Sequence, residues 1–259
     1  MNDYGMGYLF SAILGLAMGS FANVVIFRVP NHESVITPRS KCPSCKKYLA
    51  WYDNIPLLSF ILLGGKCRFC KQSISPRYPL VELLTALLFV AVYWKFGPTL
   101  ETIWYMSLIF ILVITAFVDL DHMIIPQSFI NAGLFVGGLG LLAFWDSRWI
   151  SSLIGAALIS GFLFLAGLMG KGMFHKESMG SGDVLLGLVI GMFLGWKLSI
   201  VMLFLSFLSA AVILLLLMTA KKVKTGMQIP FGPFLALGTL LALFFGDFFI
   251  HVYMTYIWV

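Results

Sequence analysis

An apolar run ends in a carboxylate at Ile109-Phe110-Ile111-Leu112-Val113-Ile114-Thr115-Ala116-Phe117-Val118-Asp119. A second run begins with one, at Asp183-Val184-Leu185-Leu186-Gly187-Leu188-Val189-Ile190-Gly191-Met192-Phe193-Leu194-Gly195-Trp196. Apolar stretches of this kind are typical of helices inside a membrane. On insertion scales a carboxylate costs about 2.5–3.5 kcal/mol at the centre of such a helix and less near the interface, so it usually marks function.

The composition agrees with a membrane protein. The 259 residues are 60% hydrophobic and 11% charged, with a mean hydropathy of +0.97, whereas a soluble domain is roughly 25% charged. We therefore predict an all-α polytopic membrane protein with about eight transmembrane helices of about 20 residues each. The first is expected to be retained, because no basic segment precedes it. The predicted spans are 5–27, 80–97, 101–119, 128–146, 149–169, 183–197, 198–219 and 230–258.

The basic residues predict an orientation. Nine of the 17 Lys and Arg residues lie from Arg28 to Arg77, and 14 of the 17 fall on one side if eight spans are correct. Because cytoplasmic loops carry an excess of Lys and Arg, this loop is expected in the cytoplasm and both termini outside. Asp119 and Asp183 then lie at cytoplasmic ends of their spans. Such loops beside an anionic leaflet account for the net charge of +6, so no nucleic-acid partner is expected.

All four cysteines lie in that loop, as Cys42-Pro43-Ser44-Cys45 and Cys67-Arg68-Phe69-Cys70. Two CxxC pairs at this separation predict a tetrathiolate zinc site, with a redox pair or free thiols as the alternative. Cytosolic thiols are kept reduced, which argues against disulfides. Four protein ligands leave no open position, so the zinc is expected to be structural and to supply folding energy to a loop with little core.

The predicted domain organisation follows from these features. Residues 1–28 form the first transmembrane helix, residues 29–79 the zinc-binding loop, and residues 80–259 the transmembrane core. The segment from Trp51 to Phe60 is more apolar than the rest of the loop. It is expected either to pack on the zinc knuckles or, as we favour, to lie against the membrane surface.

Each aspartate segment has an ordinary interpretation. Asp119-Leu120-Asp121-His122-Met123-Ile124-Ile125-Pro126 follows one span, and Gly180-Ser181-Gly182-Asp183 precedes another. Asp183 alone could be a helix N-cap, Asp119 alone an interfacial charge, and His122 an interfacial residue rather than a ligand. Gly180 and Gly182 would permit close approach by another backbone.

Taken together, the two aspartates indicate acid–base chemistry. Two neighbouring carboxylates share a proton, so one can act as general base on a water and the other as general acid. An aspartic peptidase is therefore one hypothesis. A proton-coupled transporter that uses the same carboxylates and a zinc-anchored scaffold are two more.

Further motifs occur in order along the chain: Gly19-Ser20-Phe21-Ala22-Asn23-Val24-Val25-Ile26-Phe27-Arg28-Val29-Pro30, Trp51-Tyr52-Asp53-Asn54-Ile55-Pro56, Ser75-Pro76-Arg77-Tyr78-Pro79-Leu80-Val81-Glu82 and Pro230-Phe231-Gly232-Pro233. With the aspartate and cysteine motifs, this set resembles the bifunctional type IV prepilin peptidases/N-methyltransferases, part of the GxGD class of membrane aspartic proteases. The resemblance runs nearly end to end.

The resemblance implies a function. Asp119 and Asp183 would be the catalytic pair, with Gly180 and Gly182 in the active-site loop. The substrates would be prepilins and pseudopilins of type IV pili and type II secretion, cleaved after a Gly at the cytoplasmic face of the bacterial inner membrane. S-adenosylmethionine would then methylate the new N-terminal residue. The sequence departs from the family pattern at Leu185, often Lys, and at Gln127, often acidic.

The methyltransferase site is less well marked, because the chain has no legible Gly-rich adenosylmethionine motif. Four polar residues near the predicted cytoplasmic face match family motifs: Asn23, Arg28, Arg77 and Glu82. They are expected either to serve methyl transfer or to be structural, for example through an ion pair of Glu82 with one of the two arginines.

Overall fold

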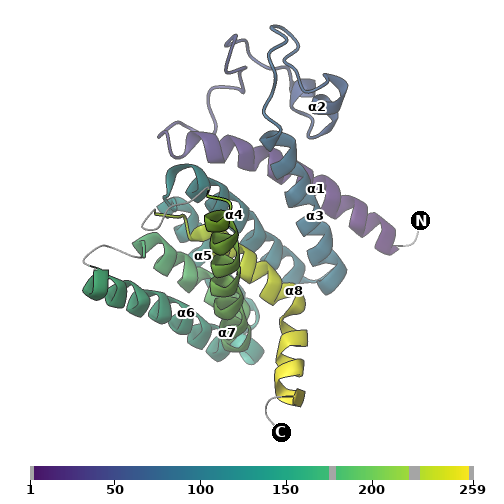
Figure 1. The fold of residues 1–259 in the computed structure, drawn as a ribbon. Helices are drawn as coiled ribbons and strands as arrows, with labels where there is room; N and C mark the ends of the chain where they lie inside the picture. Colours follow the sequence, from purple (N-terminus) through teal and green to yellow (C-terminus); the bar gives the residue numbers. More distant parts are fainter. Residues whose placement is uncertain (1–2, 175–178, 222–227, 257–259) are drawn as a thin grey trace. The chain divides into compact units, whose positions relative to one another are not determined.

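The computed structural model describes residues 3–174, 179–221 and 228–256. Helices account for nearly all of the regular structure (Figure 1). In chain order they are α1 (Asp3–Arg28), the 3₁₀ helix η1 (Trp51–Asn54), α2 (Leu58–Leu62), α3 (Arg77–Phe96), α4 (Leu100–His122), α5 (Gln127–Ala143), α6 (Trp145–Phe174), α7 (Ser181–Thr219) and α8 (Gly232–Tyr256).

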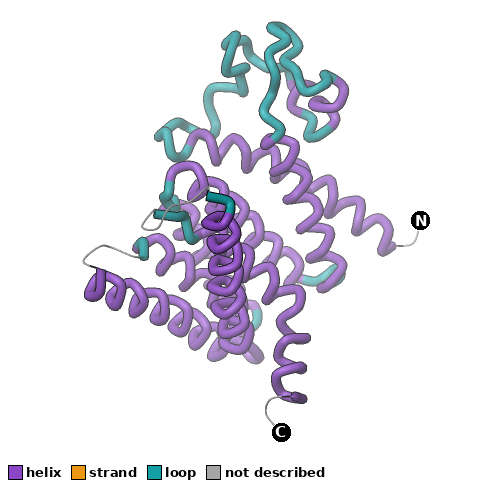
Figure 2. The backbone as a smooth tube through the Cα atoms, viewed as in Figure 1, coloured by secondary structure: helices purple, strands orange, loops and turns teal. Residues whose placement is uncertain are grey.

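The predicted all-α membrane fold is confirmed. Figure 2 shows helices and loops and no strand in the described part of the chain. Among the residues that the structure describes, six helices are long and apolar enough to cross a membrane, by length and composition. Helix α5 is apolar but shorter, with 17 residues, and α7 joins two of the predicted spans.

The 39-residue helix α7 contains the predicted spans 183–197 and 198–219, and it is broken between them. Gly195 has φ 70° and ψ 172° there, a backbone conformation that costs glycine least. The N–H of Trp196, which follows the break, donates to Ser151 Oγ of α6 at 3.3 Å. The break therefore lies two residues before the predicted boundary, where glycine allows the chain to turn.

The chain divides into two compact units, Met1–Ile114 and Thr115–Val259. In the first unit, α1 packs against α3 at two glycines one helical turn apart. A Cβ at Gly15 would lie 2.6 Å from Ala86 Cα, and one at Gly19 would lie 2.7 Å from Glu82 Cα. Small residues at this spacing let membrane helices approach closely. The predicted division into 1–28, 29–79 and 80–259 stays a prediction.

In the second unit, α7 packs against both α6 and α8. Gly155 of α6 faces Gly191 of α7 so closely that a Cβ at Gly155 would lie 2.7 Å from Gly191 O. Gly238 of α8 similarly packs against Ser206 of α7. Large apolar side chains fill the interior between these contacts; the fully buried ones are Ile130, Ile159, Leu163, Leu186, Ile190, Met202, Leu235 and Leu243.

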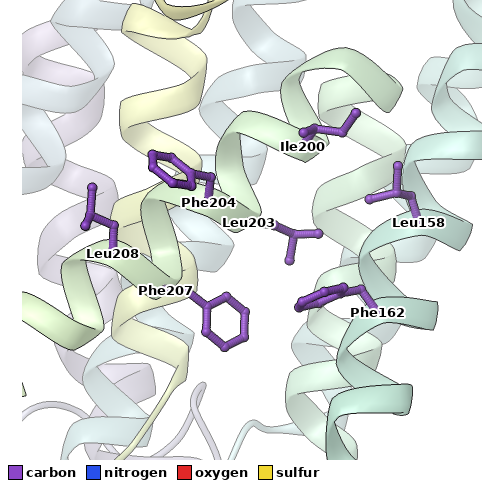
Figure 3. A pocket seen from close by; sticks show the side chains of 7 residues that line it. All are labelled: Leu158, Phe162, Ile200, Leu203, Phe204, Phe207 and Leu208. Atoms are coloured by element: carbon purple, nitrogen blue, oxygen red, sulfur yellow. The ribbon is translucent and has the colours of Figure 1, made fainter.

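An apolar groove of about 490 Å³ lies between α6 and the second half of α7 (Figure 3). Its lining residues are Leu158, Phe162, Ile200, Leu203, Phe204, Phe207 and Leu208. None of these side chains can transfer a proton or bind a metal. The groove therefore offers apolar contact and no acid–base group.

Candidate active site and metal centre

Asp119 lies in the last turn of α4, and it is buried, with 5% of its surface exposed. Its Oδ2 accepts a hydrogen bond from the backbone N–H of Gly232 at 2.8 Å. Gly232 is the first residue of α8. A Cβ at Gly232 would lie 2.8 Å from that same oxygen, so only glycine allows this approach. Asp119 is therefore enclosed by the protein and does not behave as a freely hydrated interfacial charge.

Asp183 lies in the first turn of α7, three residues after the N-cap Gly180. The backbone N–H of Gly180 donates to Asp183 Oδ2 at 3.2 Å. Asp183 thus stabilises the start of the helix, as the capping interpretation requires, although it is not the N-cap itself. Its carboxylate is half-buried and lies within range of an electrostatic interaction with Asp119. The fold therefore brings together the two carboxylates that the sequence singled out.

Two helix N-termini lie at this pair. Asp119 contacts the start of α8 and Asp183 lies at the start of α7, and each Oδ2 accepts from a glycine N–H. The N-terminus of a helix carries a partial positive charge, which stabilises a nearby carboxylate. This arrangement explains how an apolar protein tolerates two acidic groups near each other.

Gly182 allows the start of α7 to approach the segment that follows Asp119. A Cβ at Gly182 would lie 3.0 Å from the Cβ of Ile125, tighter than an ordinary contact. Gly180 is exposed, and a Cβ there would lie 3.1 Å from Asp183 Oδ2. The two glycines therefore differ in role: Gly182 permits packing between segments, and Gly180 supplies a hydrogen-bond donor.

The four cysteines form a cluster in the first unit. The Sγ atoms of Cys42, Cys45, Cys67 and Cys70 all lie within 4.8 Å of one another. The sulfurs of Cys42 and Cys70 are 3.8 Å apart, too far for a disulfide. Tetrahedral zinc with Zn–S bonds of about 2.3 Å has its sulfurs about 3.8 Å apart. The donor set and its geometry therefore fit a closed, four-coordinate metal site.

The two cysteine knuckles repeat the same backbone pattern. Cys42 N–H donates to Lys47 O at 3.0 Å, and Cys67 N–H donates to Gln72 O at 2.9 Å. Lys46 and Lys71 occupy the matching left-handed position, with φ 60° and 58°. In the first knuckle, the backbone N–H of Cys45 lowers the pKa of the Cys42 thiol to about 6. For Cys70 the backbone N–H of Gln72 lowers the pKa, but desolvation and the three other thiols outweigh it and raise the pKa to about 11. The four thiols therefore differ in how readily they ionise without a metal, whereas a bound metal requires the thiolate form.

A side-chain bridge holds the second knuckle to the segment between the knuckles. Arg68 donates to Asp53 Oδ1 at 2.7–2.8 Å, and its guanidinium lies 5.1 Å from the ring centre of Tyr52. Only 2% of the Asp53 side chain is exposed. The hydrogen bond to Asp53 raises the pKa of Arg68, which keeps the pair charged. Both residues belong to motifs visible in the sequence, but no sequence pattern pairs them.

Three of the four polar residues near the helix ends, Asn23, Arg28 and Glu82, form side-chain hydrogen bonds to backbone groups of other segments. Asn23 donates to Tyr78 O at 3.0 Å. Arg28 donates to the carbonyl oxygens of Ser34 at 2.9 Å and Pro38 at 2.7 Å.

The Glu82 carboxylate accepts from Leu57 N–H at 2.8 Å and from the Ser20 hydroxyl. Arg77 begins α3, where its N–H donates to Ser75 Oγ at 3.3 Å. The observed partners of Asn23, Arg28 and Glu82 favour the structural interpretation, and they define no site for a methyl donor.

Gly232 is a site residue that the sequence does not reveal. Its motif, Pro230-Phe231-Gly232-Pro233, is one of the ordered set that carries the family resemblance. Nothing in the motif, however, connects it with Asp119, from which it is distant in the chain. The one signal available in the sequence is that this glycine lies between Pro230 and Pro233 at the start of an apolar run.

Comparison with known proteins places the chain in a family. Residues 13–96 match the Bacterial Peptidase A24 N-terminal domain, and residues 106–215 match the Type IV leader peptidase family. The chain is 46% identical over 222 residues to the Prepilin leader peptidase/N-methyltransferase of Myxococcus xanthus (strain DK1622). That match covers 82% of this chain and 64% of the relative, so the chain spans less than two thirds of that protein.

Other relatives match along almost their whole length. The chain is 32% identical to the Prepilin leader peptidase/N-methyltransferase of Pseudomonas aeruginosa, covering 96% of this chain and 93% of the relative. It is 37% identical to that of Bacillus subtilis (strain 168), covering 93% and 96%. No solved structure gives a significant match. The chain therefore belongs to the prepilin leader peptidase/N-methyltransferase family.

Proposed function

We propose that this protein is an intramembrane aspartic endopeptidase that removes the basic leader of prepilins and pseudopilins. Asp119 and Asp183 form the catalytic dyad, and cleavage follows a Gly at the cytoplasmic face of the bacterial inner membrane. The observation that carries the proposal is that two acidic side chains lie close enough to interact electrostatically, each accepting a glycine N–H at the start of a helix, α8 for Asp119 and α7 for Asp183. The relatives named as prepilin leader peptidases support the substrate class.

The dyad works with one proton shared between two carboxyl groups. The ionised carboxylate accepts a proton from water as the water attacks the scissile carbonyl carbon. The protonated partner donates its proton to the carbonyl oxygen, which gives a tetrahedral diol. As the C–N bond breaks, the carboxyl that took the proton from water passes it to the leaving amine, and the partner recovers its own proton from a diol hydroxyl. The glycine N–H groups hold the two Oδ2 atoms in place, and we assign the Oδ1 atoms to the water and the substrate. A Gly at the leader junction lets the substrate backbone unwind at low cost.

The test compares the two dyad aspartates with Asp121, which lies two residues after Asp119. Asp119→Asn and Asp183→Asn should each abolish leader cleavage of a purified prepilin while protein yield and zinc content stay normal. Asp121→Asn is the matched control, because it removes the same charge two residues away at an exposed position. It should keep activity within about threefold, since surface changes are usually mild. Full cleavage by either dyad variant would refute the assignment.

Methylation of the new N-terminal residue is a second proposed activity, with S-adenosylmethionine as the methyl donor. The names of the relatives support it, and no residue of this chain is assigned to the methyl donor. When bound, the donor would supply the transferred methyl group. The two activities are distinguished by incubating the protein with prepilin and S-adenosylmethionine and measuring the product by mass spectrometry. A product shortened by the leader indicates the peptidase, and an added methyl mass indicates the transferase.

The same assay tests the hypotheses of a proton-coupled transporter and of a scaffold that binds pilin-like helices, because neither would shorten the substrate. The cysteine cluster is proposed to hold a structural Zn²⁺ that folds the loop, supported by the gathering of its four sulfurs within 4.8 Å of one another. The loop and the dyad are proposed to face the cytoplasm and both termini the outside. This topology rests on the distribution of basic residues.

A further inference from the structure

The short helix α2 presents an apolar face to the outside of the protein. Leu58, Ile61 and Leu62 follow the i, i+3, i+4 spacing of one helical face and are 48%, 71% and 75% exposed. Ser59, which points the other way, is buried and donates to the carbonyl oxygens of Ile55 and Tyr52. Phe60 is partly buried beside Gly65, so the three residues of α2 left exposed are all large and apolar, unlike the outer face of a helix that faces water.

A hydrogen bond ties the start of α2 to a membrane-spanning helix. Glu82, in the second turn of α3, accepts from the backbone N–H of Leu57 at 2.8 Å. Leu57 is the N-cap of α2, with φ 58°. Glu82 itself is buried against α1, where Gly19 allows its Cα to approach. The position of α2 relative to α3 is thus set by a buried carboxylate.

The exposed side of α3 is apolar around Glu82. Leu80 and Leu83, the exposed residues on either side of Glu82, are 56% and 44% exposed. Exposed leucines on a membrane-spanning helix indicate contact with lipid. Because the N–H of Leu57 is hydrogen-bonded to Glu82, α2 begins beside the first exposed leucines of α3.

The charge of the loop suits an anionic surface. Nine Lys and Arg residues lie from Arg28 to Arg77, against two acidic residues, Glu33 and Asp53. Lys66 is exposed four residues after the last residue of α2. Trp51, 79% exposed, lies in η1, which contacts α2. Basic residues attract anionic headgroups, and tryptophan is enriched at membrane interfaces.

We propose that the Leu58–Ile61–Leu62 face of α2 is a membrane-surface anchor that inserts among the headgroups of an anionic leaflet. The anchor ties the metal-binding loop to the bilayer surface at α2, with Glu82 as the residue that positions it. The anchor does not depend on the peptidase activity. It accounts for an exposed apolar helix face in a segment whose two ends are both tied to membrane-spanning helices.

The experiment replaces Leu62 with a photoreactive benzophenone amino acid in the full-length protein, reconstituted in vesicles of phosphatidylethanolamine and phosphatidylglycerol. Illumination should produce lipid adducts at position 62 at several times the level at position 36. Ile36 is the matched control, because it is an 85% exposed apolar residue of the same loop outside α2. Vesicles of phosphatidylcholine alone should lower the yield at position 62. Unchanged zinc content in each variant shows that the loop is folded.

A second pair of variants tests the role of Glu82. Glu82→Leu removes the acceptor for Leu57 N–H and should lower the lipid adducts at position 62 several-fold. Glu82→Gln keeps an acceptor oxygen and should retain them. The proposal is overturned by equal lipid labelling at positions 62 and 36, by equal yields in the two lipid mixtures, or by a position 62 that forms no lipid adduct or cross-links only to a second copy of the chain or to an added prepilin.

Discussion

Replacing Gly232 with alanine should damage the dyad without damaging the fold. The new Cβ would lie 2.8 Å from Asp119 Oδ2 and 3.3 Å from both Cβ and Cγ of Asp119. Non-bonded heavy atoms prefer separations of about 3.5 Å, so the carboxylate or the start of α8 must move by roughly half an ångström. The hydrogen bond from the Gly232 N–H has the same oxygen as its acceptor, so it must distort as well.

The size of the effect follows from the displacement. A misplacement of about 1 Å at a catalytic group costs about 100-fold in rate. A shift of roughly half that size should therefore lower kcat/KM for leader cleavage at least about tenfold, which corresponds to roughly 1.4 kcal/mol in transition-state stabilisation. The assay is cleavage of a purified prepilin, measured per folded enzyme molecule in detergent or nanodiscs.

Two other glycines serve as controls. Gly161→Ala adds a methyl group with no neighbour within 4 Å and should leave both activity and stability nearly unchanged. Gly238→Ala would press against Ser206 of α7 and should lower thermal stability, with normal activity per folded molecule. If Gly232→Ala cleaves at the wild-type rate, or if it loses only stability in the manner of Gly238→Ala, the role assigned to the Gly232 contact is wrong.

Three further predictions concern the active-site loop and the metal site. Gly182→Ala should lower kcat/KM about tenfold, because its Cβ would push the segment after the first aspartate by a few tenths of an ångström; unchanged kinetics would contradict this packing role. Cys42→Ser combined with Cys67→Ser should abolish stoichiometric zinc in metal analysis, and a full complement of zinc would contradict the ligand assignment. Arg68→Ala should speed the loss of zinc to a chelator, because the knuckle loses its bridge to Asp53; an unchanged rate would show that the bridge does not hold the knuckle.

Features that depend on neighbours in the chain were predictable from the sequence. The apolar runs, each close to the length needed to cross a bilayer, predict the membrane helices. The paired CxxC spacing predicts the four-sulfur cluster, because each knuckle is a local turn with its own backbone hydrogen bonds. Helix ends were less well predicted. The break at Gly195 differs from the predicted boundary because Ser151, on another helix, caps the new start.

Contacts between distant segments required the folded chain. No local pattern pairs Gly232 with Asp119, Leu57 with Glu82, or Arg68 with Asp53. The Gly232–Asp119 pair depends on the close approach of two helix ends that a glycine permits. The other two pairs depend on how the loop folds on itself and against α3. The sequence thus established the membrane class, the cysteine cluster and the candidate carboxylates, since these follow from residue type and spacing. The hydrogen bond that Asp119 accepts from Gly232, and the one that Glu82 accepts from the loop residue Leu57, depend on three-dimensional packing between elements far apart in the chain.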